Sequence, residues 1–268
     1  MVGSTSGARR PIIKLSEDAT GFDSPLNPKI VLDFRNFSPT NLTEESPSQG
    51  YHQMLRGIDI DCAGYAGAVA LYFSQAQDSS IENVSINAQG GVAGLRGLPA
   101  RGWGATNINI EGGRYGIDTV GTGNAGSTLV GVRLRNQTVS AIRHDQFVPL
   151  VVVGFEIETP SGSTQSAITI ESGNGANGSG LHLIDGQIRL GAEPAIAAID
   201  NRHGKNFYAR NVYVTGGDRL VKSAGLPPVT SSGLWKRIAE YGYSDQSPPD
   251  NTNKISTTLI DGAISKKP

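Results

Sequence analysis

The chain has 268 residues, with 23 lysines and arginines against 24 aspartates and glutamates and a formal net charge of −1 at pH 7. This balance creates no broad attraction to nucleic acid or to an anionic membrane surface, so we expect neither as a partner. No run of about 18 apolar residues is present, so no segment is expected to span a membrane. Cys62 is the only cysteine, which excludes an internal disulfide framework.

The first predicted elements are two short strands, Pro11–Leu15 (PIIKL) and Ile30–Phe34 (IVLDF). Both are rich in β-branched and aromatic residues, which favour strands. The segment Asn36–Gly50 is polar and contains two prolines, and it predicts a loop. We therefore expect residues 1–50 to form an irregular first coil followed by a loop.

From residue 51 onward, the sequence repeats with a period near 24 residues. One six-residue frame has an apolar residue first, Asn, Gly or Asp third, an apolar or small residue fourth and an apolar residue sixth. Such self-similarity indicates a solenoid in which neighbouring coils bury each other's inward side chains. The frame occurs eight times, and its third positions are Gly57, Asn83, Asn107, Gly131, Gly154, Asp185, Asn211 and Asp261.

The third position of this frame is predicted to be a turn. Glycine tolerates dihedral angles that other residues avoid, and asparagine can bond to local backbone or stack as an amide ladder. A second frame runs in step with the first and places a small residue before an aliphatic one. Its aliphatic members are Leu71, Leu95, Ile117, Ile142, Ile168, Ile199 and, less regularly, Leu220.

The two frames together predict an all-β protein, a right-handed parallel β-helix with about 24 residues per coil and nine or ten coils. Each unit shows short stretches of alternating polarity between Gly and Asn turns, without helical periodicity. We expect one domain over residues 1–268, with regular coils at 51–222. Residues 223–268 are expected to be irregular, with a short helix at Leu234–Tyr243 and a further coil at Leu259–Ile264.

The run from Arg56 to Gly116 includes the segments RGIDIDCAGYAGAVALYFSQAQDSSIENVSI, GLRGLP and GWGATNINIEGGRYG. It resembles the pectate-lyase-like β-helix superfamily, in particular the rhamnogalacturonase and phage-tailspike type domains often labelled pectate lyase superfamily protein. The resemblance covers roughly residues 10–222. Those proteins place a further coil before the linker that resembles Pro11–Phe34. This chain shows no such coil, so we expect it to be a truncated part of a longer protein.

The resemblance implies a polysaccharide as partner and a secreted or cell-surface location, although Met1–Arg10 contains no apolar core of a signal peptide. It also implies a possible homotrimer, because trimers occur among tailspike-like proteins. The superfamily includes lyases, hydrolases, epimerases and non-catalytic binders, so the reaction stays open.

The second frame predicts a column of outward side chains across one sheet, where substrates of parallel β-helices usually lie. The positions directly after the aliphatic residues are Tyr72, Arg96, Asp118, Arg143, Thr169, Asp200 and Val221. Polar residues continue one and two places further on four consecutive coils. We predict that the catalytic residues are among Asp118, Arg143, His144, Asp145, Glu171 and Asp200.

These residue types suit two reactions on a sugar polymer. Asp145 and Glu171 lie on neighbouring coils and could reach the separation of about 6.5–9.5 Å that an inverting glycosidase needs. A lyase instead needs a base and a group that neutralises a uronate carboxylate, which Arg143 or His144 could supply. Carboxylates also bind calcium, so we expect either no cofactor or Ca²⁺.

Five further residues are predicted to bind substrate: Arg96, Trp103, Asn201, Arg202 and His203. Each has a structural alternative. The alternating charges of the column can form a solvated ladder of ion pairs that contributes little. His203 lies in a polar stretch, DNRHGK, typical of a turn, and Trp103 can cap the stack rather than carry a sugar.

Two functions of different class follow. The first is an enzyme that cleaves an acidic polysaccharide, as a lyase or a glycoside hydrolase, on the outer face of the helix. The second is a non-catalytic glycan-binding or structural solenoid. The sequence lacks the Asn-Thr-Asp, Asp-Asp and Gly-His-Gly motifs of pectin hydrolases and a clear pectate-lyase aspartate cluster, which weakens the first.

Overall fold

The protein is described by a computed structural model that covers residues 1–268 except 4–8, 101, 103, 123–125, 147, 172–179, 192, 194, 233, 245–254 and 265–268. About 55% of the chain is strand and 1% is helix, and coils of about 26 residues stack into a β-solenoid of about six turns. The prediction of an all-β parallel β-helix is confirmed. The number of turns is smaller than the nine or ten expected, because the coils are longer and the last strands leave the parallel stack.

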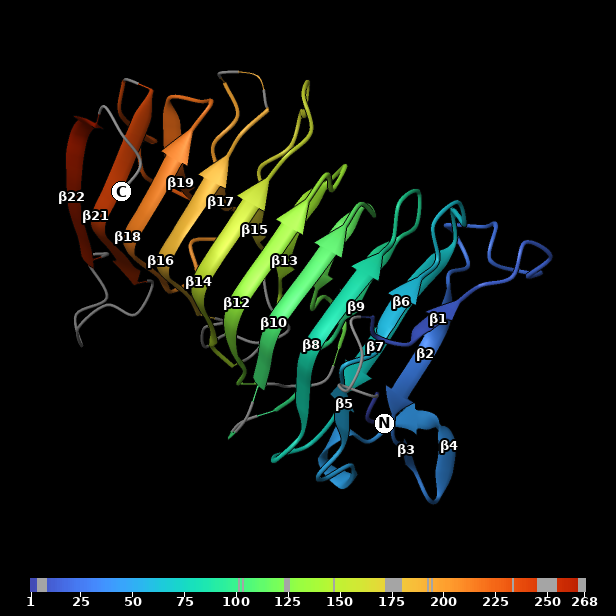
Figure 1. Cartoon of the computed structure of the whole chain (residues 1–268). Helices are drawn as coiled ribbons and strands as arrows, with labels where there is room; N and C mark the ends of the chain where they lie inside the picture. The colour runs from blue at the N-terminus through green and yellow to red at the C-terminus, as the bar shows by residue number, and fades with distance from the viewer. Residues whose placement is uncertain are drawn as a thin grey trace.

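The larger sheet, sheet A, takes one long strand from each coil, and these strands run side by side along the solenoid (Figure 1). Their order is β1-β6-β8-β10-β12-β14-β16-β18-β21-β22, and β5 also pairs with β8. The strands are β1 (Ile12–Lys14), β5 (Met54–Arg56), β6 (Asp59–Asp61), β8 (Ser80–Asn87), β10 (Gly104–Glu111), β12 (Thr128–Arg135), β14 (Leu150–Glu158), β16 (Leu181–Arg189), β18 (Phe207–Thr215), β21 (Trp235–Ser244) and β22 (Ile255–Ile264).

The second sheet, sheet B, takes the shorter strand of each coil, in the order β2-β7-β9-β11-β13-β15-β17-β19-β20. Its pairs from β2 to β19 are parallel. The strands are β2 (Lys29–Arg35), β7 (Ala68–Ser74), β9 (Ala93–Arg96), β11 (Tyr115–Asp118), β13 (Ser140–His144), β15 (Ile168–Ile170), β17 (Ile199–Asn201), β19 (Arg219–Ser223) and β20 (Val229–Thr230).

The N-terminal region carries both predicted strands, as β1 and β2. The segment expected to be a loop folds further than predicted. It forms the small antiparallel hairpin of β3 (Phe37–Ser38) and β4 (Asn41–Glu45), followed by a 3-10 turn at Pro47–Gln49. No helix among the described residues is long and apolar enough to cross a membrane.

The core lies between the two sheets and is built from columns of stacked aliphatic side chains. One column joins neighbouring strands of sheet A in register, and each of its members is at most 3% exposed. Burial of one such side chain stabilises the fold by about 1.5–3 kcal/mol. The column consists of Ile60, Ile86, Ile110, Leu134, Ile157, Ile188 and Val214.

The third position of the six-residue frame is a left-handed corner in every coil from Gly57 to Asn211, with φ between 53° and 68°. The side-chain amide of Asn107 donates to Oδ1 of Asn83, and that of Asn211 donates to Oδ1 of Asp185, both at 2.8 Å. The predicted turn and amide ladder are thus confirmed. The corner divides each long strand of sheet A into a proximal arm before it and a distal arm after it.

The C-terminal region differs from its prediction. The segment expected to be a helix is strand β21, which pairs antiparallel with β18. Its inward residues Lys236, Ile238, Tyr241 and Tyr243 are each at most 3% exposed. Their spacing of two, three and two is the spacing of the other coils around the corner, and the step of three imitates helical periodicity.

The last match to the six-residue frame, Leu259–Ile264, does not form a further coil. It lies in β22, which pairs antiparallel with β21. The pattern of alternating residues is nearly the same in both chain directions, and so it does not distinguish a parallel coil from an antiparallel strand.

Candidate functional site

Sheet B aligns most of the predicted outward column in register. Neighbouring strands pair Tyr72, Arg96, Asp118, Arg143, Thr169 and Asp200 in that order. The prediction that Val221 continues this column is wrong. Val221 pairs with Ile199 and is fully buried, and Lys222 takes the place beside Asp200.

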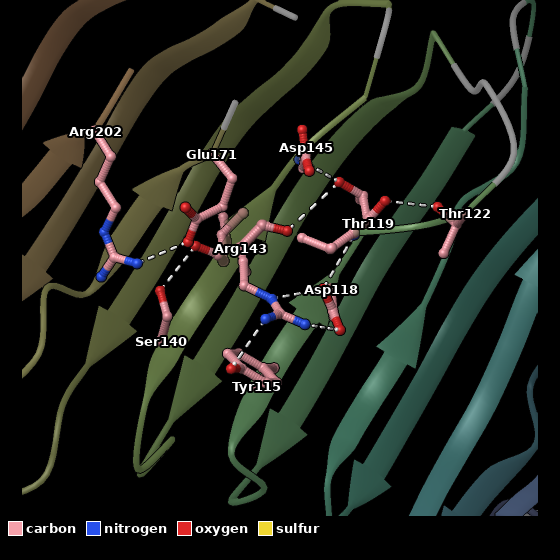
Figure 2. Close-up of polar contacts among 11 residues, drawn as sticks. Tyr115, Asp118, Thr119, Thr122, Ser140, Arg143, Asp145, Glu171 and Arg202 are labelled. Atoms are coloured by element: carbon pink, nitrogen blue, oxygen red, sulfur yellow. Dashed lines mark hydrogen bonds and ion pairs between the residues drawn. The ribbon is translucent and has the colours of Figure 1, made fainter. Parts of the chain in front are cut away.

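The centre of the column is an ion pair between Arg143 and Asp118 (Figure 2). The guanidinium donates to both carboxylate oxygens, at 2.9 and 2.7 Å, and Asp118 exposes only 3% of its side chain. Arg143 also lies 3.9 Å from the centre of the Tyr115 ring. Burial opposes the charged guanidinium, but the hydrogen bond and the charge of Asp118 outweigh it and raise the pKa of Arg143.

His144 lies on the inner side of the same strand and is completely buried. Its Nδ1 is 3.2 Å from the hydroxyl of Thr119, which also accepts the backbone N–H of Asp145 at 2.9 Å. Burial lowers the pKa of His144 to about 4, so the ring is neutral at pH 7. His144 is therefore a core residue and is not on the face that a polymer would contact.

Further along the column, Arg202 binds two carboxylates. Its guanidinium is 2.8 Å from Glu171 and 3.3 Å from Asp200, and Lys222 lies 4.0 Å from Asp200 (Figure 2 shows the bond to Glu171). Of the six predicted catalytic residues, Asp118, Arg143, Glu171 and Asp200 are thus held in ion pairs. Asp145 differs, because it makes no ion pair with a described residue, and its Oδ1, like that of Asp200, is buried without a hydrogen-bond partner there.

The predicted substrate-binding residues are dispersed. Asn201 is buried and bonds to the backbone of Lys205 in both directions, at 2.6 and 2.8 Å, which holds the turn that follows β17. His203 lies exposed in that turn. Arg96 lies 5.5 Å from the Tyr72 ring centre. Trp103 falls outside the described residues.

The outer face of sheet B is therefore a ladder of paired charges. Five pockets lie over the described residues of sheet A, and none of them is lined by a predicted site residue. Within the described part of the chain, no group of three or more His, Cys, Asp or Glu residues could hold a metal ion. The predicted calcium site thus has no set of ligands there, and no step is assigned to a metal.

Sheet A carries the cavities instead. One of them is a groove of about 460 Å³ across the distal arms of β6, β8, β10 and β12, which we call the distal groove. Its polar lining is Asp59, Asp61, Ser85, Asn87, Asn109, Glu111, Arg133 and Arg135. Two more cavities, of about 370 and 380 Å³, lie nearer the C-terminus of the same sheet, as does one of about 610 Å³ at the corner beside Asp185.

The distal groove has acidic side chains on β6, basic side chains on β12 and a mixed middle on β8 and β10, where Ser85, Asn87 and Asn109 lie with Glu111. At the acidic end Asp59 is bound by Arg10 at 2.9 Å, while at the basic end Arg133 binds Glu156 at 3.0 Å. Between them, Asn109 makes no hydrogen bond through its side chain to any described residue. Amide and hydroxyl groups in this position can both donate and accept hydrogen bonds.

The sequence prediction missed this face, although the six-residue frame contained a signal for it. The fifth position of the frame points outward from the distal arm in each coil. Read along the chain, it is almost entirely polar: Asp59, Ser85, Asn109, Arg133, Glu156, Gln187 and Tyr213.

Neither the models of known protein families nor the curated proteins compared with this chain give a match.

Proposed function

We propose that this parallel β-helix is a glycan-binding solenoid, in which an extended carbohydrate lies across the strands of sheet A in the distal groove. Membership of the pectate-lyase-like superfamily is part of the same proposal. It is supported by the parallel coils and by the sequence resemblance over residues 10–222.

The observation that carries the proposal is the shape and chemistry of the distal groove. It crosses consecutive strands, and a second pocket that shares Arg135 continues it to β16. From β6 to β16 there are five strand spacings, about 24 Å, which accommodates several sugar units of an extended chain. Hydroxyl-rich ligands need groups that both donate and accept, and the side-chain amide of Asn109 provides both. The oxygens of Ser85 and Asn87 already accept from Arg10 and from the backbone of Gln89, so these two side chains serve mainly as donors.

Binding is favoured over cleavage because the acids of sheet B are already engaged. Both carboxylate oxygens of Asp118 accept hydrogen bonds from Arg143, and Glu171 is bound by Arg202. Oxygens that are occupied in this way are not available to contact the scissile bond of a polymer.

Cleavage of an acidic polysaccharide is the second candidate, and Asp145 is the observation that favours it. Its buried and unpartnered oxygen lies one coil from Glu171, because the Glu171 N–H bonds to the carbonyl of His144, the residue before Asp145. If the protein cleaves the polymer, one of Asp145 and Glu171 would act as the general acid and the other as the general base.

The experiment that tests the proposal is a screen of the purified chain against immobilised acidic and neutral polysaccharides, combined with assays of reducing ends and of unsaturated uronate. We expect retention without either product. Asn109→Ala should lose retention, whereas Thr106→Ala, on the proximal arm of the same strand, should keep it. Product release that Asp145→Asn abolishes would replace binding by cleavage, and retention that Asn109→Ala leaves unchanged would contradict the groove.

The secreted or cell-surface location, the homotrimer and the choice between no cofactor and Ca²⁺ belong to this proposal as well. Retention with and without a chelator tests the metal, and the mass of the purified protein in solution tests the trimer.

A further inference from the structure

A polar pocket of about 200 Å³ adjoins the basic end of the distal groove. It lies over the distal arms of β12, β14 and β16, and its polar lining is Arg135, Glu156, Glu158, Gln187 and Arg189. We call it the Gln187 pocket. Two of its side chains have no polar partner among the described residues: the exposed Arg189 and the buried amide oxygen of Gln187.

The first is Arg189, whose guanidinium makes no hydrogen bond or ion pair with any described residue. It lies 5.0 Å from the centre of the Trp235 ring. Trp235 is an outward residue of β21 and is only 7% exposed. The indole thus holds the guanidinium from one side and leaves its N–H groups directed elsewhere.

The second is Gln187, which is 7% exposed although it lies on the outward side of β16. Its Oε1 is buried and has no hydrogen-bond partner within the described part of the chain. A buried amide oxygen without a partner is costly, and so a ligand that donates to it gains binding free energy. If the amide is flipped, its NH₂ group takes the place of the oxygen and needs an acceptor instead of a donor. A hydroxyl group can donate to the oxygen or accept from the NH₂ group, so it suits either orientation.

The charges around the pocket leave one positive charge uncompensated. Glu156 is bound by Arg133 at 3.0 Å, and Glu158 lies 3.8 Å from Arg135. Three arginines, Arg189 included, therefore face two glutamates. A neutral ligand would satisfy the amide but not the remaining guanidinium.

We propose that the Gln187 pocket binds a ligand unit that carries an anionic group beside a hydroxyl group, with the anion on Arg189 and the hydroxyl on Gln187. Carboxylate and sulfate are both suitable, because each can accept two N–H groups of one guanidinium. Acidic sugars have this chemistry, and the inference therefore deepens the proposed glycan binding and rests on it. The pocket then selects an acidic unit at one end of a chain that lies in the distal groove.

The test is ligand-observed NMR with D-glucuronate, D-glucose 6-sulfate, D-glucose and acetate, together with the fluorescence of Trp235. Glucuronate and glucose 6-sulfate should bind, while glucose and acetate, which each lack one of the two groups, should bind at least about tenfold more weakly. Arg189→Gln and Gln187→Leu should each weaken glucuronate by about tenfold or more. Arg210→Gln is the matched control, because Arg210 is an exposed arginine on the proximal arm of the same sheet.

Equal binding of acetate and glucuronate would reduce the pocket to a general anion site and overturn the inference. So would an equal loss in Arg210→Gln, or no effect of either pocket variant. Asn109→Ala separates this inference from the proposed function, since it should weaken retention of a polymer and leave glucuronate binding unchanged. A polymer held through Asn109 but insensitive to Arg189→Gln would refute the pocket alone. Glucuronate bound through Arg189, without any retained polymer, would refute the groove alone.

Discussion

The outer faces of the two sheets are built on the same coil and the same strand spacing, but they place their charges differently. On sheet B, Arg143 follows Asp118 on the very next strand, so the two side chains meet. On the distal arm of sheet A, Asp59 is bound by Arg10 and Arg133 by Glu156, and Asn109 on a strand between these pairs makes no side-chain hydrogen bond to a described residue. Charges are paired on both faces, but on sheet A the pairs are separated by strands whose uncharged polar side chains line a groove.

Removal of Asp118 should have the largest effect on stability. Asp118→Ala leaves Arg143 half-buried without its counter-charge, and the free energy of unfolding should fall by about 3 kcal/mol. Urea denaturation of the single variants and of the double variant with Arg143→Met measures the coupling. If Asp118→Ala lowers the free energy of unfolding by less than about 1 kcal/mol, the ion pair of Asp118 and Arg143 does not stabilise sheet B.

The buried His144 should make stability depend on pH. Its pKa is lowered to about 4 in the fold, below the ordinary value of 6.5, so the unfolded chain takes up the proton first. The contribution to stability is complete above about pH 6.5 and is lost as pH falls toward 4, by about 3 kcal/mol in total. Denaturation at a series of pH values should show this loss in the natural chain and not in His144→Gln. The same pH dependence in both would contradict the burial of a neutral imidazole.

Two asparagines on β10 have different roles, because Asn107 forms the left-handed corner and Asn109 faces the distal groove. Asn107→Ala places alanine in the left-handed region, which asparagine tolerates better. The free energy of unfolding should fall by about 1–2 kcal/mol in thermal or urea denaturation. Asn107→Gly should recover much of this cost, because glycine adopts positive φ freely. If Asn107→Gly is as unstable as Asn107→Ala, the amide ladder rather than the backbone conformation holds the corner.

The exposed pair Arg133–Glu156 should contribute least. Its two side chains are 48% and 40% exposed, so water and salt screen their attraction. Glu156→Ala should change the free energy of unfolding by less than about 0.5 kcal/mol at 0.15 M salt. If Glu156→Ala lowers the free energy of unfolding as much as Asp118→Ala does, the exposed pair on sheet A and the buried pair on sheet B do not differ in their contribution to stability.

Much of the fold could be predicted from the sequence, because the corner residue and the small-aliphatic step recur in each coil. Gly57, Asn83 and Asn107 occupy left-handed corners at the positions that the six-residue frame predicts as turns. The register failed at the last coil, where both Leu220 and Val221 are buried and no alternation shows which of them continues the column. Strand direction at β22 failed for a related reason, since alternation does not encode it.

The candidate site was harder to predict, because a list of polar residues does not show which of them already have partners. Asp118 and Arg143 were grouped correctly on one face, but their mutual hydrogen bonds are a property of side-chain reach. His144 was adjacent to that group in sequence and points to the opposite side of the strand. The open groups at Asn109 and Gln187 lack hydrogen-bond partners among the described residues, which only the packed coils reveal.

The most direct test of the account is to block each face in turn with a bulky thiol-reactive label. Cys62 is 1% exposed, and burial raises the pKa of its thiol to about 12, so a new surface cysteine can be labelled selectively. The two variants are Asn109→Cys in the distal groove and Arg202→Cys on sheet B, each compared with and without label for retention on the polysaccharide that binds. The account predicts that the label abolishes retention in the first variant and leaves it intact in the second. Retention that survives the label in the groove and is lost with the label on sheet B would contradict it.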